Sequence, residues 1–257
     1  MAELRAFVDA HALWLFVLLL VAGAAGAAVA WRRRDHAGED APIPMLRKRT
    51  ASGLLGIASG VFAALAVSVM GEGRLVALDN RVHAWLADTF GAPLLAALGW
   101  LTYLGDDAVI VAAASIIAVA LLATRHRLLA WLWVFTLLGN GLLIRLFKDL
   151  FRRTRPVHDH GYAIETGYSF PSGHAAGSLV FYGMLAYLLL VLAPERWHRR
   201  IVATALVLVA AIGSSRVLLQ VHYLSDVFAG YALGLGWLAL CIGASESLRT
   251  ARRRARA

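Results

Sequence analysis

Long apolar stretches separated by short polar turns run along most of this chain. Seven of these stretches have about the length of a helix that crosses a bilayer, which needs roughly 20 mostly apolar residues. They cover residues 11–31, 53–71, 94–124 (one helix, from about residue 107), 128–147, 173–193, 201–220 and 225–244. The pattern predicts an all-α, polytopic membrane helix bundle.

The composition supports a membrane protein and excludes three other classes. Of the 257 residues, 60% are hydrophobic and only 16% are charged, against roughly 45–50% and 25% in soluble domains. The mean hydropathy is +0.68. A soluble enzyme, a secreted disulfide scaffold and a disordered chain are each incompatible with these values. The single cysteine, Cys241, allows no disulfide within the chain.

The positive charge indicates how the chain lies in the membrane. A net charge of +9 would favour nucleic acid as the partner of a soluble protein. Here the basic residues flank apolar stretches, so they indicate topology and contacts to anionic lipid, with no nucleic-acid partner. Of the 25 Lys and Arg residues, 16 lie in segments 32–50, 125–127, 194–200 and 245–257. We therefore expect these segments in the cytoplasm and segment 148–172 on the extracytoplasmic side of a bacterial inner (plasma) membrane.

Three units are expected along the chain. They are a retained N-terminal transmembrane helix with a basic cytoplasmic loop (1–50), the main membrane domain (51–245) and an Arg-rich cytoplasmic tail (246–257). Segment 74–90 has apolar side chains on one face and Asp79 elsewhere, a pattern typical of a helix in the membrane interface. The alternative is a short loop helix that packs on the bundle.

Ionisable residues beside membrane helices are costly and indicate function. Three groups of them occur, all on the expected extracytoplasmic side. The first contains Lys148 and Arg155, seven residues apart, and this spacing of two helical turns predicts that they share a face of one helix. Pro156 is expected to end that helix. Two converging cations form an anion site, and the alternative is an ordinary basic cap at a helix C-terminus.

The second group is Phe170-Pro171-Ser172-Gly173-His174, at the start of the fifth apolar stretch. Ser172 is a favourable N-cap, and the backbone N–H groups of 172–174 are expected to be free to bind phosphate oxygens. His174 lies where it can give a proton to a bound group. A simple capping turn beside an interfacial histidine is equally compatible with these residues.

The third group lies in segment 215–226 and contains Arg216, His222 and Asp226. His222 and Asp226 are i and i+4, so they can touch on a continuous helix. The carboxylate would fix the imidazole tautomer and leave the other nitrogen as a nucleophile or base. The alternative is a structural Arg–Asp pair beside an uninvolved histidine.

Taken together, the three groups favour phosphoryl transfer without a metal or other cofactor. Guanidinium groups match phosphate oxygens, whereas metal-dependent phosphatases need several carboxylate ligands. The expected extracytoplasmic side offers few acids, and these are scattered. The polar run His158-Asp159-His160 is more simply interpreted as solvated residues than as a metal pair.

The three groups carry a resemblance to a known family. Lys-x6-Arg-Pro (148–156), Pro-Ser-Gly-His (171–174) and Ser-Arg-x5-His-x3-Asp (215–226) are similar to the signature motifs of the type 2 phosphatidic acid phosphatase / vanadium haloperoxidase superfamily. The resemblance covers roughly residues 53–244 and implies a six-helix phosphatase core, to which helix 11–31 is an addition. The haloperoxidase branch resembles soluble proteins, so the apolar stretches favour the membrane lipid phosphatase branch.

The resemblance also implies a role for each matching residue. Lys148, Arg155 and Arg216 would bind the phosphate, together with Ser172 and the Gly173 amide. His222 would attack phosphorus to form a phosphohistidine, with Asp226 holding its ring. His174 would protonate the leaving oxygen.

Three functions stay open from the sequence. The first is hydrolysis of lipid phosphomonoesters or diphosphates, with phosphatidate, phosphatidylglycerophosphate, undecaprenyl diphosphate and lipid A phosphates as substrates implied by the resemblance. The second is a lipid phosphotransferase that uses the same phosphohistidine. The third is a non-enzymatic membrane protein that binds anionic lipid through the same cations.

Overall fold

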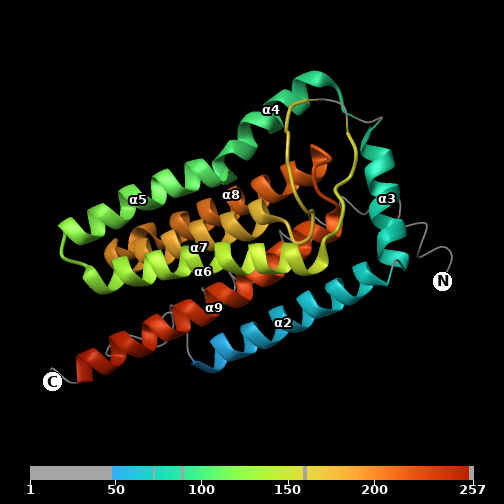
Figure 1. The fold of residues 1–257 in the computed structure, drawn as a ribbon. Helices are drawn as coiled ribbons and strands as arrows, with labels where there is room; N and C mark the ends of the chain where they lie inside the picture. The colour runs from blue at the N-terminus through green and yellow to red at the C-terminus, as the bar shows by residue number, and fades with distance from the viewer. Residues whose placement is uncertain (1–47, 72, 88–89, 159–160, 255–257) are drawn as a thin grey trace.

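The computed structural model describes residues 48–71, 73–87, 90–158 and 161–254. Regular structure in this part of the chain is entirely helical (Figure 1). The α-helices are α2 Lys48–Met70, α3 Arg74–Ala87, α4 Ala92–Thr102, α5 Asp107–Ala123, α6 Arg127–Phe151, α7 Gly173–Leu192, α8 His198–Leu218 and α9 Leu224–Arg254, with 3₁₀ turns η1 Tyr103–Gly105 and η2 Glu195–Trp197. The predicted helix 11–31, the loop up to residue 47 and residues 255–257 lie outside the described residues.

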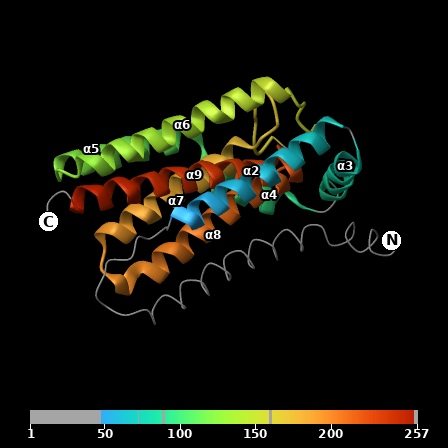
Figure 2. The ribbon, with the colours of Figure 1, turned by 90° about the horizontal axis from the view of Figure 1, so that it is seen from below.

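The described helices include six segments long and apolar enough to cross a membrane. These are Arg49–Met70, Ala92–Ala123, Arg127–Phe151, Gly173–Leu192, Glu195–Leu218 and Leu224–Leu248. They correspond to the apolar stretches predicted after residue 50, so the prediction of an all-α, polytopic membrane bundle is confirmed. The long helices lie side by side in both views, and the start of α2 lies at the same end as the C-terminus (Figures 1 and 2).

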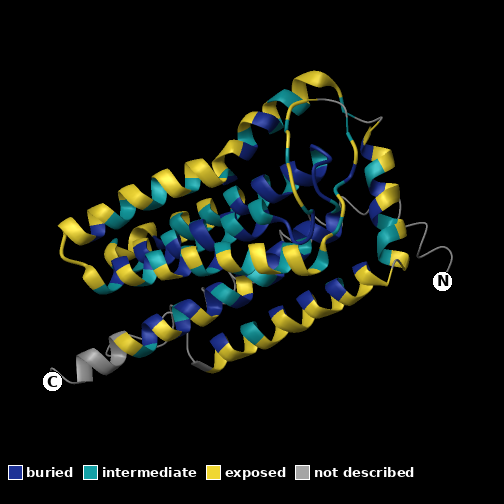
Figure 3. Ribbon diagram, in the orientation of Figure 1, coloured by how far each residue is buried: buried dark blue, intermediate teal, exposed yellow. Residues whose placement is uncertain are grey.

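Helices α7 and α9 form the centre of the bundle. In the most apolar stretch of each of these helices, about half of the residues are buried (50% in α7 and 56% in α9). The corresponding share for Ala92–Ala123 is 6%. Figure 3 shows the same contrast, with buried positions on α7 and α9 and exposed positions along α5 and α2. Trp133 of α6 packs against Phe181 and Met184 of α7 in the core. Apolar side chains on the outer helices suit a solvent that is itself apolar.

The third apolar stretch contains two helices where one was expected. Helix α5 begins at Asp107, as predicted, but residues 92–102 form a further helix, α4. Asp106 caps α5, because its Oδ1 accepts a hydrogen bond from the N–H of Ala108 at 2.9 Å. A Cβ on Gly105 would lie 2.5 Å from Cγ2 of Ile212. The break between the helices therefore brings this turn against α8, which a single straight helix would not do.

Helix α3 is present, and its buried side contains one acid that the prediction placed elsewhere. Val82 and Leu86 pack in a cluster with Val217 and Leu224 of the bundle, which is the arrangement expected from the alternative interpretation of segment 74–90. Asp79 was placed away from the apolar face but is only 1% exposed. A buried carboxylate needs a partner, and its partner is described with the site below.

The start of α7 touches the backbone of α9. A Cβ on Gly230 would lie 2.6 Å from the carbonyl oxygen of Ser172 and 3.2 Å from the backbone nitrogen of Ala176. Backbone atoms cannot swing aside as a flexible side chain can. The absence of a side chain at residue 230 therefore sets how closely the first turn of α7 approaches α9.

We expect Gly230→Ala to destabilise the bundle, because overpacking of this kind costs about 1–3 kcal/mol. The apparent melting temperature of the detergent-solubilised protein should fall. The matched control is Gly60→Ala in α2, where an added Cβ meets nothing within 4 Å, and its melting temperature should not fall. Equal melting temperatures for the two variants would contradict the close contact between α7 and α9.

Candidate active site

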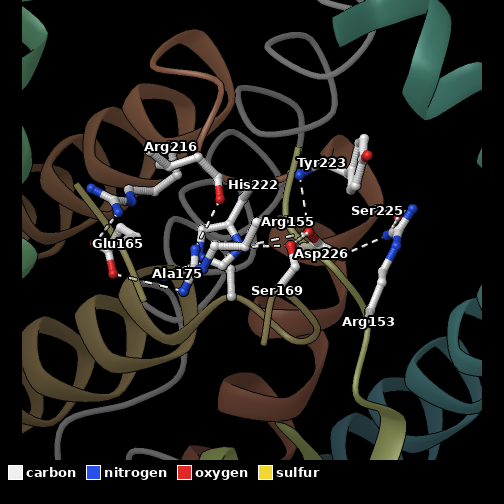
Figure 4. A network of polar contacts seen from close by, with 12 residues as sticks. Arg153, Arg155, Glu165, Ser169, Ala175, Arg216, His222, Tyr223, Ser225 and Asp226 are labelled. Atoms are coloured by element: carbon white, nitrogen blue, oxygen red, sulfur yellow. Dashed lines mark hydrogen bonds and ion pairs between the residues drawn. The ribbon is translucent and has the colours of Figure 1, made fainter. Parts of the chain in front are cut away.

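The predicted site residues lie at one end of the bundle, where α6 and α8 end and α7 and α9 begin (Figure 1). Helix α3 and loop 152–172 lie at the same end. Segments that are distant in the sequence therefore contribute side chains to one cluster, drawn in Figure 4.

Arg155 reaches the cluster from an extended segment, and the predicted shared helical face with Lys148 is wrong. Helix α6 ends at Phe151 because Arg152 takes a left-handed conformation (φ 47°). Pro156 therefore does not end the helix. The Nη1 of Arg155 donates to the carbonyl of Val221 at 2.9 Å and lies 3.1 Å from Nε2 of His222.

His222 lies in the turn between α8 and α9, which agrees with the gap between the apolar stretches 201–220 and 225–244. The positive φ of Gln220 (53°) accompanies the end of α8. The i, i+4 contact still forms, with Nδ1 of His222 3.5 Å from Oδ2 of Asp226. Nδ1 is also 3.4 Å from Oγ of Ser169. These neighbours leave Nε2 as the ring nitrogen that faces the cations.

The surroundings of His222 favour its neutral form. The ring is buried, with only 2% of the residue exposed. Burial, reinforced by the positive charges of Arg155, Arg216 and Lys148, holds the pKa of His222 well below its usual value of 6.5. A neutral imidazole has a lone pair on one nitrogen, which nucleophilic attack requires.

Asp226 is fully buried and is held by several donors. Its Oδ1 pairs with Nη1 of Arg153 at 2.6 Å, while its Oδ2 accepts from the backbone N–H of Tyr223 at 2.9 Å and from the hydroxyl of Ser169. Asp226 thus has a fixed orientation beside His222.

Arg153 links this acid to α3. Its Nη2 pairs with Oδ2 of Asp79 at 2.8 Å, and its guanidinium carbon lies 4.2 Å from the centre of the Tyr223 ring. Burial raises the pKa of Asp79, and the ion pair with Arg153 opposes that shift. Ser225 completes the group, since its backbone N–H donates to Oδ1 of Asp79 at 3.0 Å.

Arg216 is the most buried cation of the cluster, at 1% exposure. Its Nη1 donates to the hydroxyl of Thr102 at 2.7 Å, and its Nη2 pairs with the carboxylate of Glu165. The same carboxylate lies 3.7 Å from Nδ1 of His174 and 3.7 Å from Nη2 of Arg155. Glu165 therefore lies among the cations predicted to bind phosphate.

The start of α7 follows the prediction in part. Ser172 is the N-cap of α7, and its Oγ accepts from the N–H of Ala175 at 3.4 Å. The N–H of Ser172 donates to the carbonyl of Asp226 at 2.9 Å. The prediction that this N–H is free to bind phosphate is therefore wrong. The proposed anion cradle thus narrows to the amides of Gly173 and His174.

Four residues of the cluster escaped the sequence analysis: Asp79, Arg153, Glu165 and Ser169. One signal was available for Arg153, because positions two apart on an extended segment point to the same side, as Arg153 and Arg155 do. That signal appears only once α6 is known to end at Phe151. Asp79 interrupts the apolar pattern of α3, which was a second usable signal. Glu165 and Ser169 lie in an irregular loop without periodicity.

No group of three or more His, Cys, Asp or Glu side chains within the described ranges has an arrangement that could hold a metal ion. Asp159 and His160 of the polar run considered above lie outside those ranges. The polar groups at the site are thus cations, two histidines and acids paired with arginines.

Comparison with known proteins shows which family the second half of the chain resembles. Residues 129–248 match the model of the PAP2 superfamily, and this range contains all three motifs. Over these residues the chain is similar to the PAP2 superfamily. A crystal structure described as the first transmembrane PAP2 type phosphatidylglycerolphosphate phosphatase, from Bacillus subtilis, matches with a TM-score of 0.70 and 25% sequence identity. That match covers 75% of this chain and 96% of the other.

Two relatives within the superfamily carry names of lipid phosphatases. Phosphatidylglycerophosphatase B of Bacillus subtilis (strain 168) is 32% identical over 122 residues, covering 45% of this chain and 57% of that protein. Lipid A 1-phosphatase of Rhizobium etli is 36% identical over 114 residues, covering 41% and 45%. The chain spans about half the length of these curated relatives. The site described above therefore lies in a membrane helix fold that is similar to a PAP2 structure, in a chain that is similar in sequence to two named lipid phosphatases.

We expect Arg153→Ala to destabilise the protein strongly, since it leaves Asp79 and Asp226 buried without their shared cation. Removing one partner of a buried ion pair typically costs about 3–5 kcal/mol. The matched control is Arg152→Ala, whose exposed side chain donates only to the carbonyl of Asp149. Thermal unfolding in detergent measures both variants, and an equal small effect would show that the two ion pairs of Arg153 contribute little.

Proposed function

We propose that this chain is an integral membrane phosphatase that hydrolyses lipid phosphomonoesters or diphosphates through a phosphohistidine at His222, without a metal. One observation carries the proposal. The buried His222 ring has Nδ1 beside Asp226 and Nε2 beside Arg155, at 3.5 Å and 3.1 Å. This arrangement suits a neutral nucleophile that faces an anion site.

The contacts support Nε2 as the attacking atom. With the proton on Nδ1, directed at Asp226, the lone pair lies on Nε2. That lone pair can accept from Nη1 of Arg155, which lies 3.1 Å from Nε2. An arriving phosphate would take this guanidinium as its own partner and place phosphorus near Nε2. Attack forms the N–P bond and breaks the P–O bond to the lipid, and Asp226 stabilises the positive charge on the ring.

The cations supply electrostatic stabilisation. Phosphoryl transfer spreads charge over the equatorial oxygens of a loose transition state, and positioned donors stabilise that charge before the reaction begins. Lys148, Arg155 and Arg216 are proposed as these donors, with Ser172 and the amide of Gly173. The cluster already holds the carboxylate of Glu165, which supports its capacity for an oxyanion.

His174 is proposed as the proton donor for the leaving oxygen. Its ring lies at the first turn of α7, 3.7 Å from the carboxylate that occupies the cluster. In the second step water attacks phosphorus, His174 takes the proton from that water, and the bond from phosphorus to Nε2 breaks. The products are free phosphate and the lipid alcohol from a phosphomonoester, or free phosphate and the lipid monophosphate from a diphosphate.

The topology supports an extracytoplasmic site. The start of α2, the turn between α5 and α6, the turn between α7 and α8 and the end of α9 share the end opposite to the cluster. These segments carry 11 of the 19 Lys and Arg residues in the described part of the chain. By the positive-inside rule that end faces the cytoplasm. We propose that the protein lies in a bacterial inner membrane and acts on lipids of the outer leaflet.

A release assay across a panel of lipid phosphates and diphosphates, with a chelator present, tests the proposal. We expect His222→Ala to lower phosphate release by at least about 10³-fold, while membrane insertion persists. The control is His126→Ala, which changes an exposed histidine in the turn before α6 and should retain full activity. Substantial turnover by His222→Ala would exclude the nucleophile. A new phospholipid in place of free phosphate would indicate phosphotransfer.

The depressed pKa of His222 predicts the acidic limb of the pH profile. Neutral imidazole attacks, so kcat/KM should fall as pH drops through the pKa of His222 in the free enzyme. We expect this limb below pH 6.5, after correction for the substrate's own ionisation measured by ³¹P NMR. Lys148→Gln removes a nearby positive charge and should move the limb upward. A limb above pH 6.5 in the unmodified protein would argue against the buried neutral imidazole.

A further inference from the structure

Glu165 is an acid at the centre of a site proposed to bind an anion (Figure 4). Its carboxylate pairs with Nη2 of Arg216 and lies 3.7 Å from both Arg155 and His174. The proposed function gives Glu165 no role in the chemistry. A carboxylate in this position instead takes the donors that a phosphate would need.

The pairing with Arg216 is incomplete. A guanidinium binds a bidentate oxyanion through two neighbouring N–H groups, and Glu165 occupies Nη2 only. The Nε of Arg216 is buried and has no hydrogen-bond partner among the described residues, although Nη1 donates to Thr102. An unpaired buried donor is costly. A phosphate that accepts from both Nε and Nη2 would remove this cost, so the donor set fits a tetrahedral oxyanion better than it fits Glu165.

The side chain of Glu165 can leave without the loop that carries it. Its side chain is 24% exposed, against 1% for Arg216. The carbonyls of the next two residues, Thr166 and Gly167, accept from Arg155 at 3.3 Å and 3.1 Å. These bonds hold the backbone in place. A rotation about the side-chain bonds of Glu165 is therefore sufficient to vacate the cluster.

We propose that Glu165 is a specificity-determining residue, an internal competitor that holds the donors proposed to bind phosphate and selects lipid phosphates over free phosphate. The proposal rests on the proposed function. Every incoming anion must displace the carboxylate. Free phosphate has only its own oxygens with which to do so, whereas a lipid phosphate is also held by the bilayer at high local concentration. The cost of displacing the carboxylate is the same for both anions, so free phosphate is kept out at concentrations where the lipid phosphate, which the bilayer also holds, still binds.

A role of Glu165 as a support of Arg216 and a role as a competitor of phosphate predict opposite effects of its removal. If Glu165 were a permanent support that orients Arg216, its loss would weaken anion binding and lower kcat. If it is a competitor, removal of its charge should strengthen binding of small anions. Glu165→Gln has nearly the same shape as the native side chain without its charge, so it separates the two roles.

The experiment compares the unmodified protein, Glu165→Gln and a control, Glu195→Gln, at an exposed acid in the turn before α8. Orthophosphate and vanadate serve as inhibitors of phosphate release from a lipid phosphate in mixed micelles. We expect their inhibition constants to fall about tenfold or more in Glu165→Gln, as for a lost charged hydrogen-bond partner. The KM for the lipid substrate should fall less, and Glu195→Gln should match the unmodified protein.

Unchanged or higher inhibition constants for Glu165→Gln would overturn the proposal. If Glu165→Gln does not fold, Glu165→Asp, whose shorter side chain reaches Arg216 less well, should show a smaller fall in the same constants. Direct calorimetric titration with orthophosphate on a His222→Ala background measures binding without turnover. A protein that hydrolyses no lipid phosphate would refute the proposed function, whereas equal phosphate affinities with and without Glu165 would refute the competitor alone.

Discussion

The ion pairs of Arg153 with Asp79 and Asp226 are the interaction on which the rest of the site depends. They join the segment after α6, which carries Arg153, to α3 and to the first turn of α9. Asp79 is 74 residues before Arg153 in the sequence and Asp226 is 73 residues after it. Charges at this depth have few competing waters, so the geometry is strongly held once all partners are present. Because Asp226 lies beside Nδ1 of His222, the position of Arg153 determines the orientation of the proposed nucleophile.

Arg153 and its neighbour Arg155 also hold loop 152–172 in place. The described parts of loop 152–172, residues 152–158 and 161–172, contain no helix or strand, so their backbone groups need other partners. The carbonyl of Arg153 accepts from the N–H of Ser169 at 2.8 Å. Arg155 donates to the carbonyls of Thr166, Gly167 and Val221. Binding and loop order are therefore coupled, because the guanidinium proposed to bind phosphate is also a support of the loop.

The sequence predicts the helices well because a bilayer imposes a length of apolar chain that is easily recognised. It predicts helix ends poorly where tertiary bonds determine them. Arg152 and Gln220 take left-handed conformations, although neither is a glycine, the residue that usually marks such a position. Helix α6 ends at Phe151, before the expected Pro156, and α8 ends at Leu218, before residue 220. The motif residues still converge. Asp79 and Glu165 were missed because their importance comes from partners far along the chain, and nothing in their immediate sequence identifies those partners.

The charge balance of the cluster connects these observations. Lys148, Arg153, Arg155 and Arg216 are four cations, and three acids face them: Asp79, Asp226 and Glu165. Two of the acids are fixed by Arg153 and cannot leave without exposing a buried charge. Glu165 is the partly exposed third. With Glu165 in place the cluster has one positive charge in excess, whereas a phosphate dianion in place of its carboxylate would bring four negative charges against the four cations. The residual charge attracts the anion, and the exchange of Glu165 for phosphate neutralises the cluster.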